Sequence, residues 1–155
     1  MTLLDTEVRI YWEDLEPGTR FGTRKRTVTE TDLVNFVNLT WLTEELFSNG
    51  EPADRAHMGI TGRVVPGGLV YVFAEGLVAP SFQAAGIAFL NAELDIKGPT
   101  FVGDTLHVEC EVVQRRMTSR PGRGLVRTRN TVVNQHGEPV LAYTPLRMMR
   151  TRQIP

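Results

Sequence analysis

The clearest pattern in the chain is an apolar run near its middle. A turn ending in Pro66-Gly67-Gly68 leads into a stretch that extends to Val78 and is apolar on every side, with Glu75 as its one charge. A helix without a polar face is normally enclosed by other structure. Two glycines at its start leave backbone N–H groups accessible at the helix end that favours negative charge. The pattern predicts a buried central helix whose start can hold an anionic oxygen.

Upstream of this run, the spacing predicts a strand and a second helix. Residues 21–28 are β-branched and basic, as in an edge strand. Thr29 and Asp32 occupy the two positions of a capping box and open the helix. Its apolar residues recur at helical spacing, at Leu33, Val34, Phe36, Val37 and Leu39. Residues 40–63 follow no regular pattern, and long segments of this kind often carry function.

Downstream of the central run, apolar and polar residues alternate, which is typical of half-buried strands. The predicted strands cover residues 88–96, 106–112, 125–133 and 138–149, with turns between them. Strands joined in succession by turns form an antiparallel sheet, and one sheet packed on one helix is an α+β arrangement. The whole chain, residues 1–155, is predicted to be a single domain.

Composition narrows the classes of partner. Seventeen basic and 18 acidic residues give a net charge of −1, which favours neither nucleic acid nor a membrane surface. No apolar run approaches the ~20 residues that span a bilayer. Cys110 is the single cysteine, which excludes an internal disulfide and indicates a reducing compartment, so we expect a cytoplasmic protein with Cys110 in a strand core. The arginines of the C-terminal third form either solvated strand faces or a basic rim for a phosphorylated ligand.

Several segments resemble one family in the right order along the chain. They are Tyr11-Trp-Glu-Asp-Leu-Glu-Pro-Gly-Thr19, Arg26-Thr-Val-Thr-Glu-Thr-Asp-Leu-Val-Asn-Phe36, Gly98-Pro-Thr-Phe-Val-Gly-Asp-Thr-Leu106 and Asn134-Gln-His-Gly-Glu138. They are similar to segments of MaoC-like dehydratases and (R)-specific enoyl-CoA hydratases. The resemblance implies a hotdog fold, in which a long antiparallel sheet wraps around a central buried helix. It also implies a homodimer, or a higher homo-oligomer, that acts on acyl thioesters of coenzyme A or acyl carrier protein without a cofactor.

The catalytic pair of that family is not retained. The family places an aspartate and a histidine five residues apart after the first helix. An ungapped comparison puts Leu42 and Phe47 at those two positions. Neither side chain transfers protons, whereas hydration of an enoyl thioester needs one group to activate water and another to protonate the α-carbon.

The second motif of the family is better preserved. Within Gly62-Arg-Val-Val-Pro-Gly67, the last four residues align with the Ile-Ala-His-Gly end of the family's Gly-x-x-Ile-Ala-His-Gly pattern, with Pro66 in place of the histidine. The resemblance implies that the amide of Gly67, or of Gly68, binds the thioester oxygen. It also implies that Arg63 meets the phosphates of the coenzyme.

Three other residues are candidates for moving protons. Glu45, next to Glu44, lies close to the lost pair, although an exposed start of a helical turn also explains both glutamates. His57 lies in the loop before the central helix. Glu75 lies seven residues after Gly68, which resembles the carboxylate position of phenylacetate-type thioesterases, but it also suits a glutamate that reaches solvent or an arginine.

These observations favour an acyl-thioester protein of the enoyl-CoA hydratase or 3-hydroxyacyl dehydratase type, with Glu45, His57 or Glu75 moving protons. Two alternatives stay open, namely an acyl-CoA thioesterase centred on Glu75 and a non-catalytic acyl-CoA-binding subunit. The three histidines and one cysteine show no metal-ligand spacing, so no metal is expected.

Overall fold

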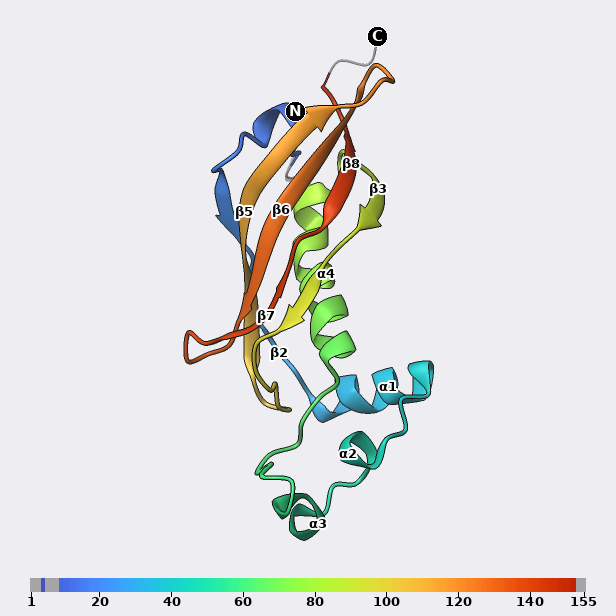
Figure 1. Ribbon diagram of the computed structural model, residues 1–155, viewed down its shortest axis with the longest axis vertical. Coiled ribbons are helices and arrows are strands. Elements are labelled where there is room, and N and C mark those ends of the chain that lie inside the picture. The colour runs from blue at the N-terminus through green and yellow to red at the C-terminus, as the bar shows by residue number, and fades with distance from the viewer. Residues whose placement is uncertain (1–3, 5–8, 153–155) are drawn as a thin grey trace.

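The computed structural model describes residue 4 and residues 9–152 (Figure 1). The helices are η1 (Trp12–Asp14), α1 (Glu30–Thr40), α2 (Glu45–Ser48), α3 (Pro52–Ala56) and α4 (Gly67–Phe82). The strands are β1 (Arg20–Gly22), β2 (Arg26–Thr27), β3 (Gly86–Asn91), β4 (Leu94–Ile96), β5 (Thr105–Met117), β6 (Arg123–Val133), β7 (Pro139–Tyr143) and β8 (Leu146–Arg150).

All eight strands belong to one antiparallel sheet, and the long β5–β6 hairpin is its centre. β1 and β2 pair with the outer side of β5, while β7 and β8 both pair with β6. The sheet curves along α4, which lies against its concave face (Figure 1). This arrangement confirms the predicted α+β class and the sheet wrapped around a central helix.

α4 buries one broad face against the sheet. Its buried residues are Leu69, Val70, Phe73, Ala74, Leu77, Val78 and Phe82. The expectation that structure encloses the helix on every side was wrong for the single chain, because Val72 is 48% exposed and Gly68 and Gly76 are exposed too. The helix also continues past Val78, where the predicted run ended, and contains Pro80 in its last turn. A proline in a last turn removes one backbone hydrogen bond without ending the helix.

The predicted strand 88–96 is two strands with different partners. β3 pairs with β8, and β4 pairs with β7. Every residue of both strands is exposed, so the predicted half-buried face was wrong. The alternation is real, but this part of the sheet extends beyond the cover that α4 provides within one chain.

The predicted strands 138–149 and 21–28 are also each divided. The first becomes β7 and β8, which separate at Thr144-Pro145, because proline has no N–H to donate to a neighbouring strand. The second becomes β1 and β2, which pair with different parts of β5. Both divisions let a single sheet bend around α4.

The N-terminal helix is capped as predicted. The amide of Asp32 donates to the Thr29 hydroxyl, and the amide of Thr29 donates to the Asp32 carboxylate, at 3.2 and 2.8 Å. α1, α2 and α3 gather at the end of the molecule where α4 begins (Figure 1). Cys110 is buried in the core, as predicted. The start of α4 therefore lies where the irregular segment 40–63 meets the sheet.

Candidate functional site

The first turn of α4 carries backbone donors without a capping side chain. Pro66 is the N-cap residue and provides no side-chain hydrogen bond. The first amides of a helix have no acceptor within the helix. The N–H groups of Gly67 and Gly68 are therefore available at the positive end of a 16-residue helix.

A small apolar pocket of about 190 Å³ adjoins Gly67. Its wall is formed by α2, α4, β4 and β7, together with the segments before α4 and after β4. The lining residues are Leu46, Phe47, Val64, Val65, Gly67, Val70, Ile96, Gly98, Pro99, Thr100, Val140 and Leu141. None of these described residues is an acid or a base, so the pocket suits an acyl group and contains no proton-transfer group of its own.

Position 67 leaves little room for a side chain. A Cβ atom there would lie 2.7 Å from Cδ1 of Ile96, closer than real Cβ contacts. At Gly68 the corresponding contact, to Cζ of Phe36, is an ordinary 3.5 Å. A side chain at position 67 would therefore displace the end of the Ile96 side chain, and Gly67 itself borders the pocket.

Phe47 lies beside the start of α4. Its ring lines the Gly67 pocket and packs against the hydrophobic core. Of the two residues that the motif comparison singled out, Phe47 therefore lines the pocket and Leu42 does not. The pocket wall at Phe47 is an apolar ring and offers no proton-transfer group.

Glu45 and His57 line a second pocket, of about 400 Å³, next to the first. Both side chains are exposed, and Glu45 accepts a 3.0 Å hydrogen bond from Nδ2 of Asn49. Leu46 lines both pockets, whereas Gly67 lines only the first. The structure therefore brings Glu45 and His57 together but does not place either in the wall of the Gly67 pocket.

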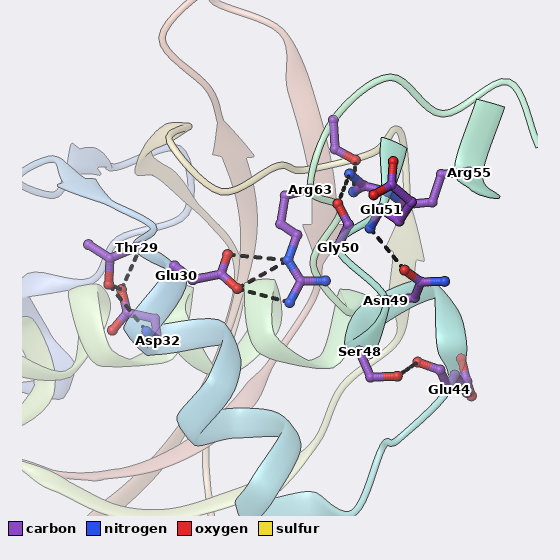
Figure 2. A network of polar contacts seen from close by, with 11 residues as sticks. Thr29, Glu30, Asp32, Glu44, Ser48, Asn49, Gly50, Glu51, Arg55 and Arg63 are labelled. Atoms are coloured by element: carbon purple, nitrogen blue, oxygen red, sulfur yellow. Dashed lines mark hydrogen bonds and ion pairs between the residues drawn. The ribbon is translucent and has the colours of Figure 1, made fainter. Parts of the chain in front are cut away.

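Arginines organise the irregular segment that covers this end of α4 (Figure 2). Arg55 is buried and donates to the carbonyls of Gly62 and Gly50, at 2.6 and 3.1 Å. Arg63 binds Glu30 of α1 through Nε and Nη2, at 3.1 and 2.9 Å (Figure 2). Arg63, the residue predicted to meet coenzyme phosphates, is thus engaged in an ion pair that fastens the segment to α1.

Glu75 lies about 12 Å from Gly67 along the helix axis, since each of eight residues rises 1.5 Å. Its Oε1 accepts hydrogen bonds from the Tyr143 hydroxyl at 2.7 Å and from Arg147 Nη2 at 2.5 Å. Burial, and then the hydrogen bond to Glu75, raise the pKa of Tyr143. Glu75 is the centre of an ion-paired cluster between α4 and the sheet, and it does not line the Gly67 pocket.

Two residues of this region were not anticipated from the sequence. Arg55 carries a buried charge, and Thr100 is only 3% exposed with a hydroxyl that has no partner in the described part of the chain. No spacing signal identifies either one, because each depends on which segments the fold brings together. The carbonyl of Thr100 accepts from the amide of Val65 at 2.9 Å, which fixes Thr100 beside the entrance to α4.

Neither a metal centre nor a membrane span is found where the structure is described. Over residue 4 and residues 9–152, no group of three or more His, Cys, Asp or Glu side chains is arranged to hold a metal ion. Within the same range, every helix is too short or too polar to cross a bilayer. The described residues bring backbone amides, apolar side chains and nearby ionisable side chains to this end of α4.

Solved structures support this interpretation of the fold. The chain is similar to a monoamine oxidase regulatory protein from Archaeoglobus fulgidus, with 30% identity, a TM-score of 0.82, and coverage of 95% of this chain and 99% of that one. It is similar to a MaoC-like dehydratase from Rhodospirillum rubrum, with 26% identity, a TM-score of 0.81, and coverage of 94% and 100%. A Mycobacterium tuberculosis protein with a double hotdog fold matches at 25% identity and a TM-score of 0.83, over 94% of this chain and 46% of that one.

Sequence comparison identifies the family directly. No curated protein sequence gives a significant match. The FAS1-like dehydratase domain region, however, matches residues 16–143, which is most of the chain. This chain therefore belongs to the FAS1-like dehydratase-region family of MaoC-like hotdog domains.

Proposed function

We propose that this chain binds the acyl group of a 2-enoyl or 3-hydroxyacyl thioester in the Gly67 pocket and takes part in the reversible addition of water to it. The observation that carries the proposal is the juxtaposition of uncapped helix amides and an apolar pocket at the same glycine. An N–H group directed at a developing oxyanion stabilises a transition state by roughly 3 kcal/mol. The acyl chain then occupies the apolar wall while the thioester oxygen lies at the amide.

The size of the pocket favours a short acyl chain. Its volume of about 190 Å³ corresponds to roughly six water-sized groups, at about 30 Å³ each. Phe47 and Ile96 limit its extent on two sides. The thioester carrier, coenzyme A or acyl carrier protein, lies outside the pocket, and water addition by proton transfer needs no cofactor.

The acid and the base come from outside the Gly67 pocket. One source is the neighbouring pocket of the same chain, where Glu45 and His57 both contribute to the wall. The other source is a partner hotdog domain, which makes this chain the acyl-binding subunit. The second source is favoured because Phe47 replaces the expected histidine at the pocket and because neither Glu45 nor His57 lines the Gly67 pocket.

A second hotdog domain fits the uncovered edge of the sheet. β3 pairs with β8 on one side only, and β3 and β4 expose Ile87, Phe89, Leu90, Leu94 and Ile96. An exposed apolar edge strand is a site for association with another strand. The match to about half of a double-hotdog chain supports pairing of two such domains. We assign this edge to a dimer, formed in the simplest case by a second copy of the chain.

Incubation of the purified protein with crotonyl-CoA tests the proposal, with loss of the enoyl absorbance and equilibrium binding measured on the same sample. Turnover that Glu45→Gln or His57→Gln abolishes assigns the chemistry to the chain itself. Binding without turnover assigns it to a partner domain. The absence of both binding and turnover for short enoyl-CoA and 3-hydroxyacyl-CoA substrates would overturn the proposal.

A thioesterase centred on Glu75 is not favoured by this geometry. The carboxylate is paired with Tyr143 and Arg147, lies about two helical turns beyond Gly67 and does not line the pocket. A nucleophile or general base must approach the thioester carbon, and that carbon lies near Gly67 in the proposed complex.

A further inference from the structure

Thr100 is the exceptional residue of the apolar pocket. Among the described residues that line it, Thr100 alone has a polar side chain. Thr100 is only 3% exposed, and its hydroxyl has no hydrogen-bond partner in the described part of the chain. An unpaired buried hydroxyl destabilises a folded protein, so a ligand oxygen that pairs with it gains affinity.

Backbone contacts hold Thr100 close to the start of α4. The Thr100 carbonyl accepts the amide of Val65, two residues before Gly67, at 2.9 Å. The next residue, Phe101, forms an isolated bridge to Val64. Thr100 is therefore fixed on two sides of its backbone, and it belongs to the same small pocket as Gly67.

The proposed reaction adds one oxygen to the acyl chain itself, as a hydroxyl group on C3. Hydration of a 2-enoyl thioester forms a C–O bond at C3, while a proton adds to C2. The 3-hydroxyacyl form carries this oxygen, and the 2-enoyl and saturated forms do not. A threonine hydroxyl both donates and accepts, so it can pair with a hydroxyl in either direction.

We propose that the hydroxyl of Thr100 binds the C3 hydroxyl of a 3-hydroxyacyl thioester and makes the pocket selective for that form. This inference rests on the proposed function, because it requires the acyl group to occupy the Gly67 pocket. Thr100 acts here as a specificity-determining residue. Without it the pocket would distinguish acyl groups by size alone.

Calorimetric titration with butyryl-CoA and the two enantiomers of 3-hydroxybutyryl-CoA tests the inference, because these probes differ only at C3. The wild-type protein is expected to bind one hydroxyl enantiomer roughly two- to tenfold more tightly than butyryl-CoA, the range for one neutral hydrogen bond. Thr100→Val should bring this ratio close to one, and Thr100→Ser, which keeps a hydroxyl, should preserve most of it.

Thr128 provides a matched control. It is also a buried threonine with an unpartnered hydroxyl, but it lies on β6 and does not line the pocket. Thr128→Val should leave the ratio unchanged while removing the same kind of group. An unchanged ratio in Thr100→Val, or no preference in the wild-type protein, overturns the role of Thr100 alone. No binding of any probe overturns the proposed function together with it.

Discussion

Glu75 and Arg147 form a close ion pair, with 2.5 Å between Oε1 and Nη2, across the contact between α4 and β8. The two side chains are 24% and 13% exposed, and the guanidinium also lies over the rings of Phe82 and Phe89. The only charge of the central helix is thereby neutralised against the sheet. Glu75 therefore holds α4 against the sheet.

Glu75→Gln is therefore expected to lower the free energy of unfolding by about 2 kcal/mol, because Arg147 keeps its charge but loses its carboxylate partner. Urea denaturation followed by circular dichroism measures the change. Asp95→Asn is the control, since Asp95 is 67% exposed in its pair with Lys97 and such pairs contribute about 1 kcal/mol or less. Unchanged stability in Glu75→Gln, together with lost release of free thiol from acyl-CoA, would instead support a thioesterase.

Cys110 should be unreactive in the native protein. Burial raises the pKa of its thiol to about 12, and the thiolate is the reactive form. At pH 8 we expect a thiol reagent to react roughly three orders of magnitude more slowly with folded than with unfolded protein, in line with the lower thiolate fraction. Absorbance of the released or bound reagent measures the labelling rate. Rapid labelling of the folded protein would show that the core around β5 opens readily.

The cap of α1 should lose its effect in acid. Burial alone would raise the pKa of Asp32, but hydrogen bonds from Thr29 and the charge of Arg26 outweigh burial and lower it. A carboxylate with a lowered folded pKa stabilises the fold above its unfolded pKa of about 4, and this contribution is lost as the pH falls through the folded pKa.

Asp32→Ala should therefore cost about 1 kcal/mol at neutral pH, the usual loss for a helix cap, and markedly less in strong acid. Urea denaturation of both proteins at several pH values gives the difference directly. A difference that stays constant as the pH falls would mean that the negative charge of Asp32 contributes nothing to the cap.

Leu90→Asp should weaken self-association. Leu90 lies on the open edge strand β3 and is 46% exposed, so a charge there would be buried unpaired by a second domain. Sedimentation velocity should show a shift toward monomer. Leu39→Asp on α1, where Leu39 is 82% exposed, should leave the association state as it is in the wild type. Equal behaviour of the two variants would place the interface elsewhere.

The sequence was sufficient to predict features that depend only on residues close together in the chain. The capping box of Thr29 and Asp32 is local, and the paired alternation of β5 and β6 follows from a hairpin. The glycine turn before α4 was likewise recognisable, because Pro66, Gly67 and Gly68 are consecutive.

Features that depend on distant segments were beyond the sequence pattern. The alternation of residues 88–96 gave no sign that β3 and β4 would have different partners, or that both faces would be exposed. The partners of Glu75 come from residues 143 and 147, far along the chain. Thr100 became a candidate only because the fold places it, unpaired, in the wall of an apolar pocket.

Phe47→Ala tests whether the acyl chain lies in the Gly67 pocket, because the Phe47 ring forms part of the pocket wall. Dissociation constants should be measured for saturated acyl-CoAs of increasing chain length, with Phe36→Ala as the control, because Phe36 contacts the core but does not line the pocket. Enlarging the pocket should extend the preferred chain length, with a gain of about 0.8 kcal/mol, or roughly fourfold in affinity, for each further buried methylene. An identical chain-length profile in the wild type and in Phe47→Ala would contradict the claim.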